Sequence, residues 1–175
     1  DKRNQKFKTS DGFRSFYSVD IPFVSETYSL KNVYNYKYFT ELYEENISSV
    51  SLYLSAVNSI ANEDVKLSER LNIPSSRLRG FQFGRVGPKD GDDFIGGNYI
   101  STLNFSSTLP QILENSQNTD FLIFFDVANI WGVDYDSTLS DANKIRSAAG
   151  IGVDWFTPIG PLNFSLSQPL TKSST

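Results

Sequence analysis

The chain is organised around one long stretch, which reads RLRGFQFGRVGPKDGDDFIGGN over residues 77–98. Connections of this length are uncommon in compact domains, and they are usually functional or disordered. Large apolar side chains lie among its glycines, so parts of it should be buried: Phe81, Phe83, Val86, Phe94 and Ile95. At Arg79-Gly80-Phe81 a guanidinium stands beside a flexible glycine and an aromatic anchor, which suits a loop held in a cavity by a forked bond to a carboxylate. On composition alone, an ordinary surface loop is an equal alternative.

Outside this stretch, apolar and polar residues alternate with the period of two that is typical of β-strands. The alternation predicts seven strands, at residues 13–23, 28–42, 47–60, 97–108, 119–131, 145–157 and from 162 onward. In the fifth of these, Phe125 and Val127 should face one side and Asp126 the other. Residues 62–71 could hold one short helix, and residues 110–118 a turn or a short helical connection.

This pattern predicts an all-β fold, an antiparallel meander in which short and long connections alternate. Its strands are long enough to cross a bilayer, and such an alternation of connections is typical of transmembrane β-barrels. A soluble β-sandwich or soluble barrel has the same alternation of side chains, so the periodicity leaves both classes open.

Composition excludes several functions. With 175 residues, the chain has the length of one domain. It has no Cys and no His, so the usual catalytic triads are unavailable, and we expect neither enzyme activity nor a cofactor. Asp90, Asp92 and Asp93 lack the ligand spacing of an EF-hand loop, so no metal site is expected. The net charge of −4 and the pI of about 4.8 argue against a nucleic-acid surface.

Five motifs resemble, in order, those of the BamA-type outer-membrane assembly factors, whose superfamily also holds the two-partner secretion transporters. They are Arg79-Gly80-Phe81 with Gly87-Pro88 and Gly96-Gly97-Asn98; Phe125-Asp126-Val127-Ala128-Asn129-Ile130-Trp131; Arg146-Ser147-Ala148-Ala149-Gly150-Ile151-Gly152; Trp155-Phe156-Thr157-Pro158-Ile159-Gly160-Pro161-Leu162; and Gln168-Pro169-Leu170. Ala128 departs from the pattern, because the family usually has glycine there. The motifs run in order from Arg79 to Leu170, a span of a little over half of the chain.

The resemblance implies that residues 1–175 are the C-terminal part of a sixteen-stranded transmembrane β-barrel in the bacterial outer membrane, with a plug loop at about residues 62–96. It also implies a role in folding and inserting β-barrel proteins, with unfolded outer-membrane proteins, accessory lipoproteins and the lipid bilayer as partners. In the family, the arginine of the loop reaches into the lumen and meets an aromatic residue and an aspartate. Carried over, Arg79 should contact Phe124 and Asp126, while the functional loop also includes Gly80, Phe81, Gly87 and Pro88.

Two other functions stay open: a polypeptide-translocating transporter of the same superfamily, and a soluble β-sheet binding module. The residues resemble the ninth to fifteenth strands of the family's barrel, so the sheet should have two open edges. Unpaired backbone groups at an edge are costly in hydrocarbon. In isolation we therefore expect the edges to pair with a second copy, or the sheet to curl into a partial barrel around its apolar residues.

Overall fold

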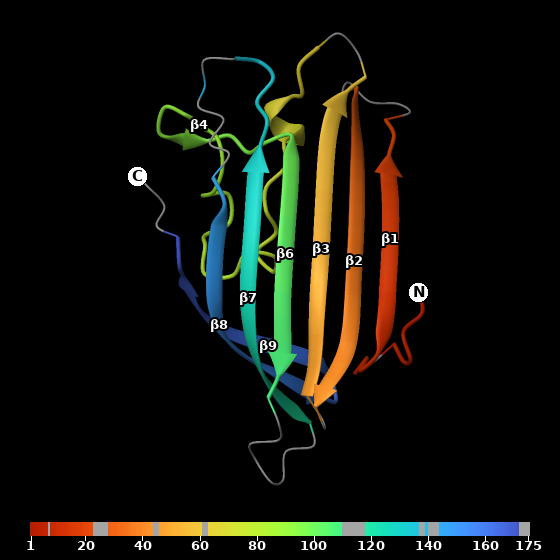
Figure 1. Cartoon of the computed structure of the whole chain (residues 1–175). Helices are drawn as coiled ribbons and strands as arrows, with labels where there is room; N and C mark the ends of the chain where they lie inside the picture. The colour runs from red at the N-terminus through yellow and green to blue at the C-terminus, as the bar shows by residue number, and fades with distance from the viewer. Residues whose placement is uncertain are drawn as a thin grey trace.

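Seven long strands form a single antiparallel sheet in the order β1-β2-β3-β6-β7-β8-β9 (Figure 1). The computed structural model describes residues 1–6, 8–22, 28–43, 46–60, 63–109, 118–136, 139 and 144–171. The strands are β1 (Gly12–Asp20), β2 (Ser29–Tyr43), β3 (Asn46–Ser59), β6 (Tyr99–Thr108), β7 (Thr119–Trp131), β8 (Arg146–Thr157) and β9 (Gly160–Pro169). The expected all-β meander of about seven strands is confirmed.

The segment between β3 and β6 holds a second, smaller sheet and a single turn of 3-10 helix. Its two short strands are β4 (Lys89–Asp90) and β5 (Asp93–Phe94), which pair with each other, and its turn is η1 (Leu67–Glu69). From residue 63 to residue 98 this segment is called the plug loop below.

The short helix expected at residues 62–71 is wrong for the described residues, which form only the turn η1. The backbone N–H of Val65 donates to the carboxylate of Asp134, and Leu71 exchanges two backbone hydrogen bonds with Gly97. Because other parts of the chain use these backbone groups, a continuous α-helix cannot form. β1 ends at Asp20 rather than at residue 23, and most of the connection expected at 110–118 lies outside the described residues.

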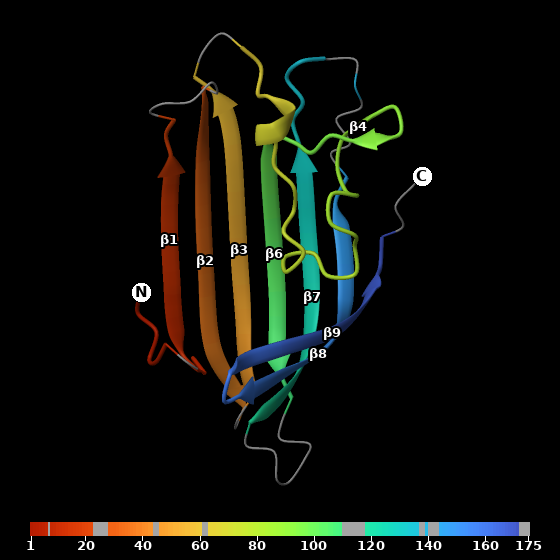
Figure 2. The same ribbon diagram turned by 180° about the vertical axis from the view of Figure 1, so that it is seen from behind.

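The sheet is strongly curved, and the plug loop lies against its inner face. Seen from behind, the loop crosses β6, β7 and β8, and the hairpin of β8 and β9 bends round in front of the lower part of β2 and β3 (Figure 2). The space inside this curve is called the lumen below.

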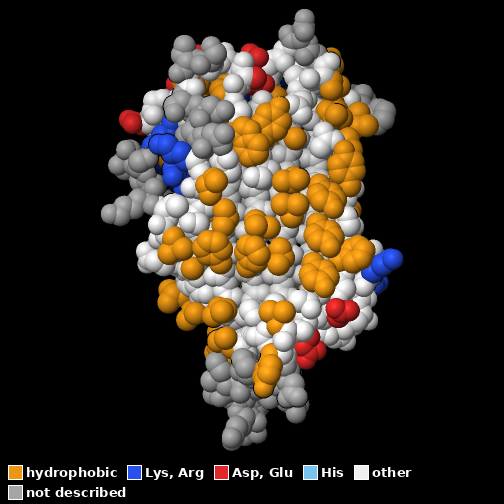
Figure 3. Space-filling model, viewed as in Figure 1, with side chains coloured by type: hydrophobic (Ala, Val, Ile, Leu, Met, Phe, Trp, Pro, Cys, Tyr) orange, Lys and Arg blue, Asp and Glu red, His pale blue; other side chains and the backbone are white. Residues whose placement is uncertain are grey.

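Apolar side chains gather on the outer face of the sheet (Figure 3). Among the exposed ones are Leu54, Phe105, Ile123, Phe125 and Ile151. The sheet therefore curls with its apolar residues outside, and the expectation of a curl around them is wrong. The physical reason is that the plug loop occupies the inside of the curve. Polar side chains of the strands bond to loop atoms there, and the apolar side chains of the alternating pattern lie on the outer face.

The buried apolar core lies between the plug loop and the inner face of the sheet. The loop contributes Val65, Leu71, Ile73, Leu78 and Val86, and the sheet contributes Val57, Ile100, Ala128 and Ile130. Ala128, which departs from the family's glycine, is 2% exposed and belongs to this core. Both layers are needed, because a sheet must bury its inner face against a second element.

The pairing register lines up four polar side chains across the middle of the inner face. Lys37 of β2 lies opposite Ser51 of β3, Ser51 opposite Asn104 of β6, and Asn104 opposite Asp126 of β7. Neighbouring residues of β7 point to opposite sides, since Asp126 is 0% exposed and Phe125 is 38% exposed. This row brings polar groups to the tip of the plug loop.

Candidate functional site

Arg79 at the tip of the plug loop forms a forked ion pair with Asp126 on β7. Its Nε donates to Oδ2 at 2.8 Å and its Nη2 donates to Oδ1 at 2.7 Å. Its backbone N–H donates a third hydrogen bond to Oδ2 at 3.1 Å. A planar guanidinium with two parallel bonds to one carboxylate is fixed in orientation as well as in position.

Asp126 is satisfied by further donors although it is fully buried. Asn104 donates from Nδ2 to Oδ1 at 2.8 Å, and the same amide group donates to the backbone carbonyl of Arg77 at 2.7 Å. Asn104 thus joins Asp126 of β7 to the backbone of the plug loop at Arg77. A buried ion pair contributes little net stability, but removal of one partner costs about 3–5 kcal/mol because the other charge stays buried.

Phe124 forms the floor beneath the guanidinium. The Cζ atom of Arg79 lies 3.4 Å from the centroid of the Phe124 ring, which is close enough for a stacked cation–π contact. Such a contact contributes about 0.5–2 kcal/mol, more when it is shielded from water, and Phe124 is 4% exposed. The structure thus brings together the three residues that the sequence analysis named, Arg79, Phe124 and Asp126.

Gly150 on β8 makes room for the Phe124 ring, and the register places the two opposite each other. A Cβ atom at Gly150 would lie 2.5 Å from Cζ of Phe124 and 2.2 Å from the carbonyl oxygen of Leu166. The glycine of β8, the ring of β7 and the guanidinium of the loop therefore form three successive layers. We call Arg79, Phe124, Asp126, Asn104 and Gly150 the Arg79 clamp.

The other residues expected in the functional loop lie close to the sheet. Gly80 and Gly87 both have positive φ angles, +85° and +118°, and each approaches a strand too closely for a side chain. A Cβ at Gly80 would lie 2.9 Å from Oγ of Ser167, and one at Gly87 would lie 2.8 Å from Cγ2 of Ile130. Pro88 is fully buried, and Phe81 packs against the apolar core.

A second ion pair, which the sequence analysis missed, holds the outer end of the plug loop. Arg70 donates from Nη2 to Oδ1 of Asp134 at 2.7 Å, and its side chain is 1% exposed. Asp134 follows β7 and also accepts from the backbone of Val65 and from Nδ2 of Asn98. In the sequence, the only hint of this site was Asn98, the last residue of the glycine-rich motif. No local pattern indicates that Asn98 would bond to Asp134.

The environment of Asp134 favours its charged form. Burial alone would raise the pKa of this carboxyl group, but hydrogen bonds from Val65 and Asn98 and the charge of Arg70 together hold it below its usual range. The guanidinium of Arg70 also lies 4.8 Å from the centroid of the Tyr135 ring. Two arginines of the plug loop therefore hold it to β7 and the segment that follows: Arg79 through Asp126, and Arg70 through Asp134.

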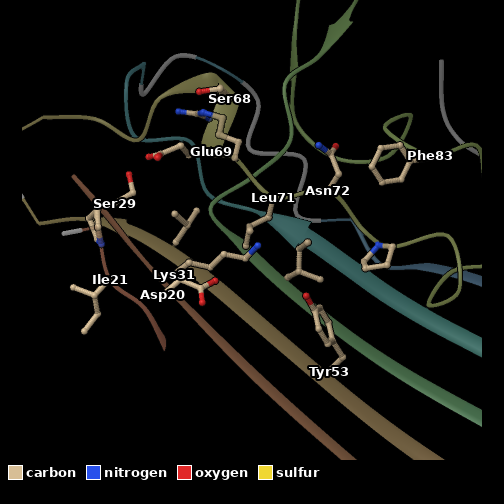
Figure 4. A pocket seen from close by; sticks show the side chains of 15 residues that line it. Asp20, Ile21, Ser29, Lys31, Tyr53, Ser68, Glu69, Leu71, Asn72 and Phe83 are labelled. Atoms are coloured by element: carbon tan, nitrogen blue, oxygen red, sulfur yellow. The ribbon is translucent and has the colours of Figure 1, made fainter. Parts of the chain in front are cut away.

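A polar cavity lies between the plug loop and strands β1 to β3 (Figure 4). Asp20, Lys31, Tyr53 and Glu69 are among its lining residues, and its volume is about 590 Å³. Among the described residues, no three His, Cys, Asp or Glu side chains lie close enough together to hold a metal ion. Nor does any helix of the described part have the length and apolar character needed to cross a membrane.

Comparison with known proteins matches residues 1–175 to the Omp85 superfamily domain. The outer membrane protein assembly factor BamA of Neisseria meningitidis is 27% identical over 54% of this chain and 15% of that protein, and the BamA of Neorickettsia risticii is 25% identical over 77% and 18%. A SAM50-like protein of Schizosaccharomyces pombe is 29% identical over 71% of this chain and 28% of its own length. The chain therefore spans less than a third of each of these relatives.

A solved structure shows the same fold. The crystal structure of BamA from Haemophilus ducreyi lacking POTRA domains 1–3 superposes with a TM-score of 0.82 at 24% sequence identity. The likeness covers 99% of this chain and 38% of that one. The expected fold, a meander that is one part of a larger transmembrane barrel, is confirmed by this likeness.

Proposed function

Because the chain belongs to the Omp85 superfamily, as its motifs predicted, we propose that the protein containing it folds β-barrel proteins and inserts them into the outer membrane. The chain lies in the bacterial outer membrane, where the sequence analysis expected it. Its partners in this role are unfolded outer-membrane proteins, accessory lipoproteins and the lipid bilayer. The assembly role is supported by the relatives, two of which are named outer membrane protein assembly factors.

Within that protein, this chain supplies part of the barrel wall and the loop that fills it. The observation that carries the proposal is the Arg79 clamp, in which a loop cation is held by a fully buried carboxylate of the wall. A loop fixed at its tip keeps the wall in one curvature, because the same contacts join β6, β7 and β8 from the inside. We assign Arg79, Phe124 and Asp126 to this positioning role, and Gly80, Phe81, Gly87 and Pro88 to the close fit of the loop.

The substitution Arg79→Ala in the full-length protein tests this role. The reaction to follow is the insertion of a denatured outer-membrane barrel into vesicles that hold the purified protein, with the heat-modifiable gel shift of the inserted barrel as readout. Since the change leaves Asp126 buried without its cation, we expect a loss of roughly 3–5 kcal/mol of loop docking, a slower insertion rate and faster proteolysis of the loop.

Arg85→Ala is the matched control. Arg85 is an exposed arginine of the same loop, and its Cζ lies 5.9 Å from the ring centroid of Phe94. This variant should insert barrels at the unsubstituted rate. Full insertion activity of Arg79→Ala, together with an unchanged proteolysis pattern of the loop, would contradict the proposed role of the clamp.

The runner-up function is the export of a polypeptide through the lumen, as in the secretion transporters of the same superfamily. A protease-protection assay separates the two functions. The same vesicles are offered either a denatured barrel or a long secreted polypeptide, and the fraction of each substrate that survives external protease is measured. Protection of the secreted polypeptide without insertion of the barrel would favour export. The number of POTRA domains upstream of the barrel in the full-length protein gives an independent distinction.

A further inference from the structure

A second polar cavity, of about 570 Å³, lies in the lumen beneath the tip of the plug loop. We call it the luminal chamber. The bend of the β8–β9 hairpin around the lower sheet (Figure 2) lets strands from β2 to β9 contribute to one wall. Its lining consists mainly of hydroxyl, amide and charged groups: Lys37, Ser49, Ser51, Ser75, Ser76, Arg77, Arg79, Asn104, Ser106, Leu122, Gly152, Asp154, Asn163, Phe164 and Ser165.

Positive charge in the luminal chamber exceeds negative charge. Three of its described lining residues are cations, Lys37, Arg77 and Arg79, and its one carboxylate is that of Asp154. Arg79 is already neutralised by Asp126. The carboxylate of Asp154 accepts a hydrogen bond from Nδ2 of Asn163 at 2.7 Å, and no described cation lies within ion-pair distance of it. Lys37 and Arg77 therefore face the chamber with no described carboxylate within ion-pair distance, although Asp154 attracts Lys37 and Asp126 attracts Arg77 over a longer range.

The two cations are also poorly hydrogen-bonded. Arg77 donates from Nη1 to Oγ of Ser51 at 2.6 Å and lies 5.2 Å from the ring centroid of Tyr53. A guanidinium has five donors, and among the described residues this one finds no other side-chain partner. Lys37 contacts the ring of Phe39 at 4.8 Å and has no hydrogen-bond acceptor within the described part of the chain.

Burial disfavours the charged form of Arg77. It lowers the pKa of this guanidinium, and the neighbouring Tyr53 and Asp126 offset that effect only in part. A cation whose charged form is disfavoured in this way is stabilised by any oxyanion that enters the chamber. The cavity is within the size range of small-molecule and peptide-fragment sites.

We propose that the luminal chamber binds an acidic side chain of a polypeptide segment, with Lys37 and Arg77 as the groups that hold its carboxylate. A guanidinium and an ammonium that converge on one cavity match a carboxylate, and the surrounding serine and asparagine side chains match the peptide groups that flank it. A lipid fits the chamber less well, because only Leu122 and Phe164 offer large apolar surfaces to an acyl chain.

The test is a titration of the full-length protein in detergent with two capped pentapeptides, one holding two glutamates and the other two glutamines. We expect the acidic peptide to bind about tenfold more tightly, and the double variant Lys37→Gln/Arg77→Gln to lose that difference, because a charge-assisted hydrogen bond is lost with each cation. Lys31→Gln removes a charge from the neighbouring cavity on the same strand and should leave binding within about twofold. Equal binding of the two peptides would overturn the proposal.

A second measurement guards against misfolded variants. These 175 residues contain no cysteine, so an introduced thiol is the only one among them, and any cysteine elsewhere in the full-length protein is first replaced by serine. The acidic peptide should slow maleimide labelling of Ser76→Cys, which lines the chamber, and leave Ser68→Cys in the neighbouring cavity unaffected. Equal protection of both thiols, or none, would contradict the site. Inorganic phosphate that gave the same protection at the same concentration would overturn the assignment to a polypeptide. Neither measurement uses assembly activity, so failure here leaves the proposed function standing.

Discussion

Gly150→Ala should loosen the docking of the plug loop, because Gly150 lies opposite Phe124, whose ring stacks on the guanidinium of Arg79. The added methyl group would lie 2.2 Å from the carbonyl oxygen of Leu166 and 2.5 Å from Cζ of Phe124. The clash with the carbonyl oxygen must be relieved by a shift of the β9 backbone against β8, and the clash with the ring by a tilt of Phe124 towards the guanidinium of Arg79. Overpacking of this kind costs about 1–3 kcal/mol. If that energy is lost from loop docking, the open population of the loop rises roughly 5- to 150-fold.

Limited proteolysis of the loop measures this population when opening and closing are fast relative to cleavage. Gly152→Ala is the control, since it adds the same methyl group to the same face of β8 two residues further on. Its Cβ would lie 3.0 Å from Cδ1 of Leu122, the end of a flexible side chain, and 3.3 Å from the carbonyl oxygen of Phe164. We expect cleavage to rise at least about fivefold in Gly150→Ala, and to stay within about twofold in Gly152→Ala. Equal cleavage of the two variants would refute the layered packing of the clamp.

Three further outcomes follow from the two ion pairs. Arg79→Lys keeps the charge but loses the fork, so its loop should be cleaved at a rate between those of the unsubstituted protein and Arg79→Ala. Asp134→Asn leaves Arg70 buried without its anion, at a cost of roughly 3 kcal/mol, and should accelerate amide hydrogen exchange at Val65 while cleavage near Arg79 changes less. Because the folded-state pKa of Asp134 lies below its ordinary value of 3.8, its carboxylate stabilises the docked loop at neutral pH, and this contribution is lost as the pH falls below 3.8. Val65 exchange, corrected for its intrinsic pH dependence, should therefore rise only in that acidic range, and a rise already complete at pH 6 would contradict the assignment.

The seven strands and the face of Asp126 could be predicted because both depend on local periodicity. A residue's face follows from its parity along a strand, and Phe124 and Asp126 have the parity opposite to that of Phe125. The small ribbon of β4 and β5 was missed, although Gly91-Asp92 between its arms is a hairpin signal, because arms of two residues are too short to show alternation.

Contacts between distant segments were harder to predict from the sequence. The Arg70–Asp134 ion pair joins residues 64 positions apart, in segments that carry no repeating pattern. The role of Gly150 depends on a register that places it opposite Phe124, and the sequence indicates only that a small residue in a strand allows close approach. The contact of Arg79 with Phe124 and Asp126 was expected from family resemblance together with parity, and parity alone would have left open which acidic residue it meets.

The division of the core between loop and wall explains why the clamp matters to more than the loop. Five of the nine buried apolar residues in the central cluster belong to the plug loop, so withdrawal of the loop would remove most of the second layer on which the inner face packs. On the other side, the outer face is apolar and suited to hydrocarbon, which offers no hydrogen bonds to a strained or unpaired backbone. The plug loop inside the curve therefore sets the curvature of this wall. Phe124 of β7 and Gly150 of β8 form the floor of the Arg79 clamp. Release of Arg79 should therefore loosen the pairing of β7 with β8 before it affects the pairing of β1 with β2. Faster amide exchange confined to β1 and β2 in Arg79→Ala would refute this order.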